Sequence, residues 1–214
     1  MGTYKGSPLN PWSGKVGAVQ FSNWMGILVV KSMPQSYNDA KTAAQIVIRA
    51  RAAAISRLLS GFLSAIRLGF KGVGVNMSAY NAGQKANSAI VMNGTQIAAA
   101  SFPGISISDG NAQALGVATG ELGVTSTEVE VTCPNNADNI DGFGTDIIHL
   151  AVVKEDGTKP SSFLAIGTRA TLAGGVNVDI GAAYEGAVCH GYLFAQRADG
   201  SAQSDTRYFT FEMA

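Results

Sequence analysis

The sequence predicts an α+β protein in which a β-hairpin arm and a helical hairpin precede an immunoglobulin-like or fibronectin-like β-sandwich. Three observations lead to this prediction. Two short apolar runs lie near the start, a long stretch without proline follows with helical periodicity, and segments of period two fill the second half of the chain. Of the 214 residues, 46% are hydrophobic and 14% are charged, so the chain can bury a substantial core.

Residues 1–35 are predicted to form the arm. The runs GKVGAVQ (14–20) and WMGILVVK (24–31) flank Phe21-Ser22-Asn23 and are typical of the two strands of a hairpin. An isolated hairpin is only marginally stable in water, so we expect this one to lie on another surface, namely that of a second copy of the chain. The expected contact residues are Val19, Trp24, Ile27 and Val29.

The second region, residues 36–101, is predicted to be a helical hairpin. Thr42 and Gln45 have the capping-box spacing of a helix start, and no proline follows before Gly69, a residue suited to a helix end. A shorter helix over residues 78–91 is expected to pack back on the first. At 100° per residue, apolar side chains gather on one side of the long helix: Ile55, Leu58, Leu59, Phe62, Leu63 and Ile66.

The other side of the long helix is basic. Residues 1–100 contain ten Lys or Arg and one acidic residue, a net charge of +9, whereas residues 101–214 carry −9. Three explanations stay open for this side: a face that is solvated or meets the acidic half of the same chain, contact with nucleic-acid phosphates, or contact with the acidic half of a neighbouring copy. Subunit contact is slightly favoured because the two halves balance. The expected partner-contact residues are Arg49, Arg57, Arg67 and Lys71.

Residues 102–214 are predicted to form the β-sandwich and to fold on their own. Seven or eight short strands at this spacing are typical of such a fold. Cys133 and Cys189 are candidates for a bond between facing sheets, but the Trp and Tyr that accompany this bond in immunoglobulin domains are missing, so buried free thiols are favoured. Strands are expected over residues 105–108, 115–119, 127–133, 146–154, 163–169, 176–180, 188–197 and 207–213.

Catalytic and metal-binding patterns are not evident in the sequence. His149 and His190 fall inside expected strands, and Cys189 would point to the sheet face opposite to its neighbour His190. The loop around Asp138 is rich in oxygen donors, but it lacks the glutamate that ends a calcium-binding EF-hand loop. No apolar run approaches the length of a membrane span, and the first residues lack the apolar segment of a signal peptide. We therefore expect no catalytic residue, cofactor, metal or membrane span.

Six segments distributed along the chain carry a family resemblance. They are SGKVGAVQFSNWMG (13–26), KSMP (31–34), TAAQIVIRARAA (42–53), AYNAGQKANSAI (79–90), GYLFAQRADG (191–200) and TRYFTFEM (206–213). They resemble an uncharacterised protein family of Bacteroidota and their phages, although Met25 stands where that family commonly has lysine. The motifs are structural, so the resemblance implies no activity, cofactor or catalytic residue. The association of the family with phage-like genes suggests a virion component.

Two functions other than catalysis fit these observations. The first is a structural protein, such as a capsid, tail or tube subunit of a phage virion, that assembles through its arm and its charge-polarised surfaces. Its partners would be copies of itself, other virion proteins and, through phosphate contacts, nucleic acid. The alternative is a surface or adhesion module that binds through the sandwich loops, located in the cytoplasm or at the cell surface of the bacterial host. An enzyme is the least supported of the three classes.

Overall fold

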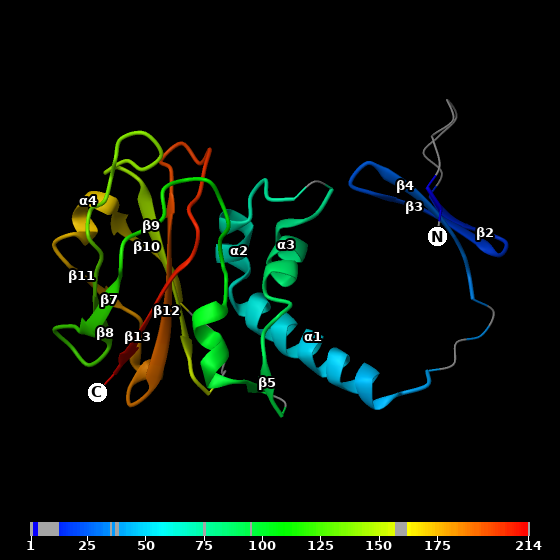
Figure 1. Cartoon of the computed structure of the whole chain (residues 1–214), viewed down its shortest axis with the longest axis horizontal. Helices are drawn as coiled ribbons and strands as arrows, with labels where there is room; N and C mark the ends of the chain where they lie inside the picture. Colours follow the sequence, from blue (N-terminus) through cyan, green and yellow to red (C-terminus); the bar gives the residue numbers. More distant parts are fainter. Residues whose placement is uncertain are drawn as a thin grey trace.

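The computed structural model describes residues 2–3, 13–34, 36, 39–74, 76–94, 96–156 and 162–213. Its elements follow one long axis, with a small N-terminal sheet at one end, helices in the middle and the larger sheets at the other end (Figure 1). The chain is therefore a mixed α+β protein, as predicted. The first residue, residues 4–12 and residue 35, which belong to the expected arm, lie outside the described residues.

The arm contains a four-stranded antiparallel sheet rather than a lone hairpin, with strand order β1-β4-β3-β2. Its strands are β1 (Gly2–Thr3), β2 (Gly14–Val16), β3 (Val19–Trp24) and β4 (Ile27–Ser32). Met25 and Gly26 join β3 to β4 with φ angles of 49° and 84°, as a type I′ hairpin turn requires. The residues expected between the two strands, Phe21-Ser22-Asn23, lie inside β3, because the turns form at the glycine-containing pairs on either side of it.

Two consecutive helices replace the single long helix that was expected, α1 (Ala43–Gly61) and α2 (Leu63–Gly69). The capping box is confirmed, since Thr42 and Gln45 each accept a hydrogen bond from the backbone N–H of the other. The break falls at Phe62, which follows Gly61 and is buried. Figure 1 shows that the chain changes direction there, so that α2 runs beside the large sheets while the start of α1 projects away from them.

The shorter helix, α3 (Ala79–Ala86), ends five residues before its expected end. The cause is the buried side chain of Asn87. Its amide donates to the carbonyl oxygens of Gly83 and Ser106, and its Oδ1 accepts from the Ser106 N–H at 2.9 Å. These bonds end the helix and fix the segment that follows. That segment contains β5 (Met92–Asn93), β6 (Gln96–Ile97) and the 3₁₀ helix η1 (Ala99–Gly104).

Two antiparallel sheets make up most of the C-terminal half, with orders β10-β9-β12-β13 and β11-β8-β7. Their strands are β7 (Thr119–Leu122), β8 (Glu128–Thr132), β9 (Ile147–Lys154), β10 (Ser162–Thr168), β11 (Val176–Asp179), β12 (Val188–Gln196) and β13 (Arg207–Glu212). Two short helices interrupt them, α4 (Arg169–Leu172) and η2 (Ala182–Tyr184). The segments of period two thus form antiparallel sheets, whereas the immunoglobulin-like sandwich stays a prediction.

The larger sheet is covered on both of its faces. One face, with Leu150 and Leu193, shares a core with the three-stranded sheet. The other face, with Val153 and Tyr192, shares a second core with the helices. Residues 102–214 alone would therefore expose the second face. A separate domain beginning at residue 102 stays a prediction, and this shared core argues against it.

Two of the expected strands differ from the structure. Residues 105–108 are not a strand, because the backbone N–H groups of Ile107 and Ser108 donate to the Thr206 hydroxyl instead of to a neighbouring strand. The strand expected over residues 115–119 begins only at Thr119. Leu115, within that expected strand, is buried although it lies outside β7.

Candidate interaction surface

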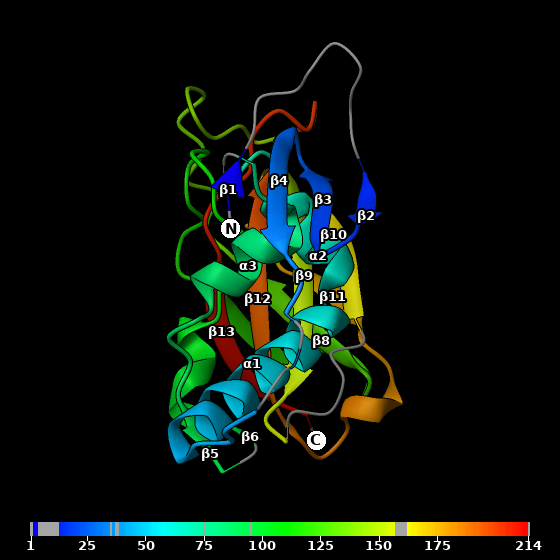
Figure 2. The same ribbon diagram turned by 90° about the vertical axis from the view of Figure 1, so that its right-hand side faces the viewer.

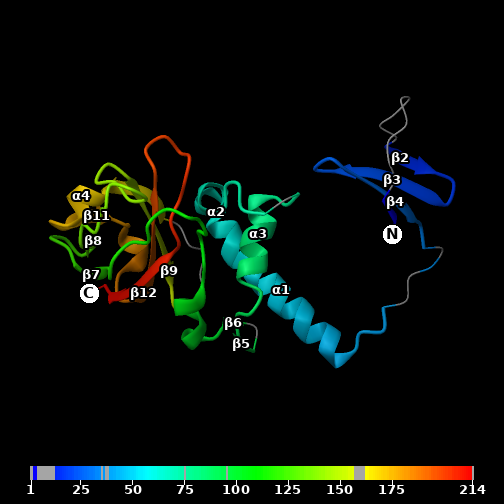
Figure 3. The ribbon, with the colours of Figure 1, turned by 45° about the horizontal axis from the view of Figure 1, so that its top comes forward.

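The N-terminal sheet stands apart from the rest of the chain in Figures 1 and 3, and Figure 2 views the molecule from the arm, with the helices and larger sheets behind it. Among the described residues 13–34, none is buried. No element outside the sheet packs extensively against it within the described part of the chain. The described residues 39–42 lead into α1 without forming a helix or strand. Within the described residues, the sheet is therefore held mainly by its own backbone pairing and turns.

The strand register divides the arm residues into two faces, because directly paired residues of antiparallel strands share a face. Trp24, Ile27 and Val29 lie together on one face, which we call the arm basic face because Lys15 and Lys31 lie on it. Val19, expected to act with these three, lies on the other face, here called the arm apolar face. The apolar residues of that face are Val16, Val19, Phe21, Leu28 and Val30.

A second apolar surface lies where α1 projects from the body. The side chains of Ile46 and Val47 are 55% and 58% exposed there, and Val91 beside them is 60% exposed. They border a hollow of about 330 Å³ that we call the α1 groove. Its lining residues are Ile46, Val47, Ala50, Arg51, Val91, Met92 and Gly94. Sequence reasoning missed this groove because the apolar stripe that it identified on the long helix began at Ile55 and did not include Ile46 or Val47.

The four basic residues expected to contact an anionic partner are not gathered into one patch. Arg49 donates to both carboxylate oxygens of Asp39, at 2.6 and 2.9 Å, and this guanidinium lowers the pKa of Asp39. Lys71 donates to the Gly200 carbonyl oxygen at 3.2 Å. Arg67 is exposed on α2. Two of the four side chains thus interact with other parts of the same chain.

Arg57 occupies a hollow of about 230 Å³ between α1 and the end of β9, together with Glu155 and Asp156. Arg57 thus shares the lining of this hollow with two acidic residues of the same chain, which is compatible with one of the explanations left open by the sequence. Contact of Arg49, Arg57, Arg67 and Lys71 with nucleic acid stays a prediction.

An acidic surface covers the outer face of the three-stranded sheet. Glu121 lies directly opposite Glu130, and Glu128 directly opposite Asp179. Within the described residues, none of these carboxylates forms an ion pair with Lys or Arg. Like charges placed directly opposite each other destabilise a sheet. This surface lies at the end of the molecule away from the arm (Figure 1).

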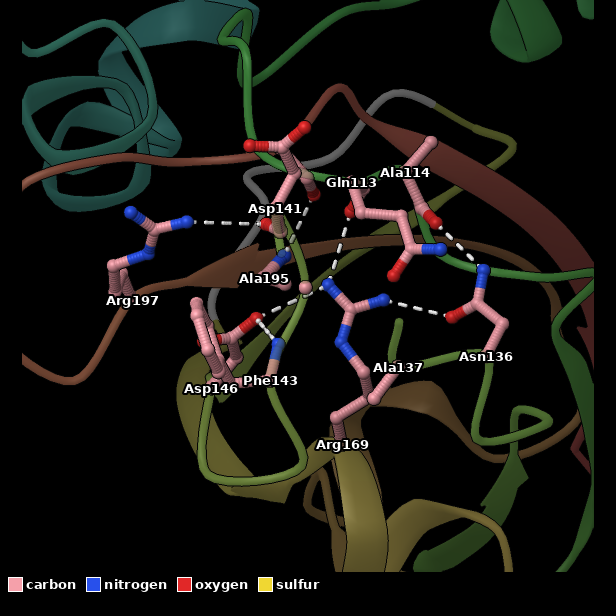
Figure 4. A network of polar contacts seen from close by, with 12 residues as sticks. Gln113, Ala114, Asn136, Ala137, Asp141, Phe143, Asp146, Arg169, Ala195 and Arg197 are labelled. Atoms are coloured by element: carbon pink, nitrogen blue, oxygen red, sulfur yellow. Dashed lines mark hydrogen bonds and ion pairs between the residues drawn. The ribbon is translucent and has the colours of Figure 1, made fainter. Parts of the chain in front are cut away.

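A buried polar network, shown in Figure 4, joins three segments of the body. Arg169 and Asp146 form an ion pair, Nη2 to Oδ2 at 3.3 Å, with only 1% and 2% of their side chains exposed. Arg169 also donates to the Asn136 side-chain oxygen at 2.8 Å and to the Gln113 carbonyl at 3.0 Å. The Phe143 N–H donates to Asp146 at 2.9 Å. The network therefore fixes the loop between β8 and β9 against the start of α4.

Nothing in the sequence pattern identified this ion pair, because its members lie 23 positions apart and belong to no motif. Two of its polar atoms, Asp146 Oδ1 and Arg169 Nε, are buried and have no hydrogen-bond partner within the described residues. Neither residue lies on a hollow of the surface that we identify. A buried ion pair that connects loops in this way has the arrangement of a structural contact.

The two histidines pack against the helical side of the larger sheet. His190 stacks on Phe102 with ring centroids 4.0 Å apart, and its Nδ1 lies 2.8 Å from the Tyr208 hydroxyl. His149 Nε2 lies 3.0 Å from the Gln196 side-chain oxygen. Burial lowers the pKa of both imidazoles. Each histidine thus fills a packed site in which burial disfavours the charged imidazolium.

Cys133 and Cys189 are both free and buried, as the sequence favoured. Burial raises the pKa of the Cys133 thiol, and it raises the pKa of Cys189 to about 11. Since the thiolate is the reactive form, neither side chain has the character of a nucleophile. In the described part of the chain, no three His, Cys, Asp or Glu residues are grouped closely enough to hold a metal. The oxygen-rich loop is closed by Asp138 itself, whose Oδ1 accepts three backbone N–H groups.

Comparison with known proteins identifies a family. The model of a family of unknown function, DUF6266, matches residues 11–210, so the chain belongs to this family. The match includes β2 to β4 of the arm as well as the helices and both large sheets. No curated protein and no solved structure matches the chain. Within the described residues, no helix has the length and apolar character needed to cross a membrane.

Proposed function

We propose that this member of the DUF6266 family is a non-enzymatic structural subunit that assembles with copies of itself through its N-terminal arm. One observation supports this most directly: the arm is a four-stranded sheet in which no described residue from 13 to 34 is buried. Small sheets without a packed face are marginally stable, and contiguous exposed apolar side chains commonly mark protein-binding surfaces. A neighbouring copy would supply the missing packing.

The charge distribution supports the same proposal. Lys15 and Lys31 lie on the arm basic face, and the acidic surface of Glu121, Glu128, Glu130 and Asp179 lies at the far end of the molecule. Opposite charges at opposite ends favour an antiparallel approach of two copies and increase their rate of encounter. The contribution of these exposed charges should decline with salt, because screening acts over about 8 Å at physiological ionic strength.

The proposal that this assembly is a virion has less support than the proposal that the chain assembles with itself. The resemblance of the sequence to a family associated with phages is the reason to propose a virion subunit, located in the virion and in contact with other virion proteins. The C-terminal sheets, which face each other across one core, would in this proposal form an immunoglobulin-like body exposed on the particle.

Sedimentation velocity of the full chain and of a chain lacking residues 1–34 tests the proposed function. We expect the full chain to form oligomers as its concentration rises, and the shortened chain to stay monomeric with an unchanged melting temperature. A full chain that stays monomeric at every concentration would contradict the proposal, as would a shortened chain that assembles equally well.

A further inference from the structure

We propose that the arm apolar face of one copy docks in the α1 groove of a second copy, and that the exchange is reciprocal, so that each copy of a dimer gives one arm and receives one. This inference rests on the proposed function and adds the site that receives the arm. Four observations support it: the continuity of an apolar stripe, the chemistry of the two surfaces, the position of the residues just before α1 and the area of contact.

The apolar stripe of α1 continues past the edge of the body. Ala54 and Leu58 are buried in the second core or at its margin. Ile46 and Ala50 precede Ala54 at intervals of four residues and line the groove, so they occupy the same side of the helix one and two turns earlier. A stripe that is covered along one half of a helix and exposed along the other lacks a partner for the second half.

The two surfaces have matching chemistry. The arm apolar face contains no charged residue, and its polar residues in β3 and β4 are Asn23 and Ser32. The groove is apolar except for Arg51, whose Nε is buried and has no hydrogen-bond partner within the described residues. A side-chain or carbonyl oxygen of an incoming arm would satisfy this donor, and aliphatic side chains would fill the remaining volume of about 330 Å³.

The residues just before α1 lie on a side of the helix other than that of the groove. The ion pair between Asp39 and Arg49 fixes these residues against α1 shortly before the helix begins. At 100° per residue, Arg49 lies about 130° around the helix from the middle of the groove lining. The chain therefore reaches α1 at Asp39 from a side other than that of the groove, and the ribbons of Figures 1 and 3 show the arm apart from α1.

The contact area favours reciprocal exchange. With strands about 4.8 Å apart and about 3.3 Å per residue, the face formed by β2 to β4 covers roughly 300 Å², so one docked arm removes roughly 600 Å² from the two partners together. This is less than specific interfaces usually bury. Two docked arms bury roughly 1,200 Å², the lower end of the range for stable complexes. A closed two-fold dimer, in which both arms dock, therefore buries enough area for a stable complex, whereas the docking of a single arm does not.

Two pairs of matched variants test the proposal through the affinity of self-association. Val47→Glu alters the groove, and its control Ile48→Glu makes the same change on a neighbouring, 64% exposed residue outside the groove. Val30→Glu alters the arm apolar face, and its control Val29→Glu places the charge on the opposite face of the same strand. A buried unpaired carboxylate should weaken the dimer tenfold or more, on the order of 1.4 kcal/mol or above. We expect this loss for Val47→Glu and Val30→Glu and not for the controls.

Any other combination of effects of these variants on self-association contradicts the docking, and each combination indicates a different contact. If Val30→Glu weakens association and Val47→Glu does not, two arms pack on each other. If only Val47→Glu weakens it, two grooves meet. If neither substitution changes the affinity of self-association, the proposed assembly stands and the docking of the arm in the α1 groove is overturned. A full chain that is monomeric throughout would overturn both.

Disulfide capture provides a test that does not depend on introducing a charge. A Val30→Cys chain and a Val47→Cys chain, distinguished by a size tag, are mixed and oxidised mildly, while the native thiols stay protected by burial. We expect a disulfide-linked heterodimer from this mixture. The control mixture of a Val29→Cys chain with a Val47→Cys chain should give little heterodimer. Exclusive Val30→Cys homodimers would contradict the proposal. So would a chain carrying both Val30→Cys and Val47→Cys that closes its disulfide internally as a monomer, because its arm would then occupy its own groove.

Discussion

The arm and the body contain strands of similar length that differ in what covers them. β4 and β13 each have six residues, and both belong to antiparallel sheets. Phe209 and Phe211 of β13 are buried in the first core, whereas no residue of β4 is buried. The comparison teaches that strand formation and strand burial have separate causes here: turn geometry and backbone pairing form the strands of the arm, and only a second surface can bury them.

The largest expected effect in the body comes from the buried ion pair. Arg169→Met removes the cation and leaves Asp146 as an uncompensated buried charge, so we expect a loss of about 3–5 kcal/mol in the free energy of unfolding. Denaturant titration measures this loss. The double variant Arg169→Met with Asp146→Leu should lose markedly less, because no unpaired charge remains. A double variant as unstable as the single one would show that the other hydrogen bonds of the network matter more than the charge.

A matched pair of valines compares the two regions directly. Val131 in β8 is fully buried, and Val30 in β4 is not. In dilute, monomeric protein, Val131→Ala should lower the free energy of unfolding by roughly 2–3 kcal/mol, through lost burial and a residual cavity. Val30→Ala should change it by less than about 0.5 kcal/mol, as is usual for surface positions. Equal losses at low concentration would mean that the arm is packed in the monomer.

The histidines of the body predict a dependence on pH that the arm does not share. Burial lowers the pKa of His149 and of His190, so the unfolded chain binds protons more readily than the folded one. Stability should therefore be full above the unfolded pKa near 6.5 and decline as the pH falls below it. Melting temperatures between pH 7 and 5 measure this. His149→Met with His190→Met should flatten the decline, and an unchanged decline would assign it to carboxylates.

The smallest expected effect is in the turn of the arm. Met25 has a φ of 49°, in a position where asparagine is favoured over a long apolar side chain. Met25→Asn should stabilise the hairpin by roughly 0.5–1 kcal/mol without changing the melting temperature of the body. Amide chemical shifts of β3 and β4 in an NMR spectrum report the population of the hairpin. A decrease in that population would show that Met25 makes a contact the arm needs.

Local patterns made much of the fold predictable. The capping box at Thr42 and the alternation from β8 to β13 depend on neighbouring residues, and both appear as expected. The break at Phe62 was not predictable, because it depends on where α2 meets the larger sheet. Residues 105–108 have the pattern of a strand, but a distant Thr206 hydroxyl captures their backbone N–H groups.

The candidate site was predictable only in part. Val19 and Trp24 lie five positions apart in β3, so their opposite faces follow from alternation once the turn is placed at Met25-Gly26. The sequence alone did not place that turn. The exposure of Ile46 and Val47 had a signal in their apolar run, but only the fold shows that the body ends before it reaches them. The Arg169–Asp146 pair had no local signal at all.

Hydrogen exchange at two protein concentrations tests most directly whether the arm is built for another copy. In dilute protein, amides of β3 and β4 should exchange far faster than those of β9 and β12, because no packed face protects them. At high concentration the arm amides should slow, together with amides near the α1 groove, while the protection of β9 and β12 stays the same. Arm amides that are as protected as the body in dilute monomer, and indifferent to concentration, would contradict the central claim.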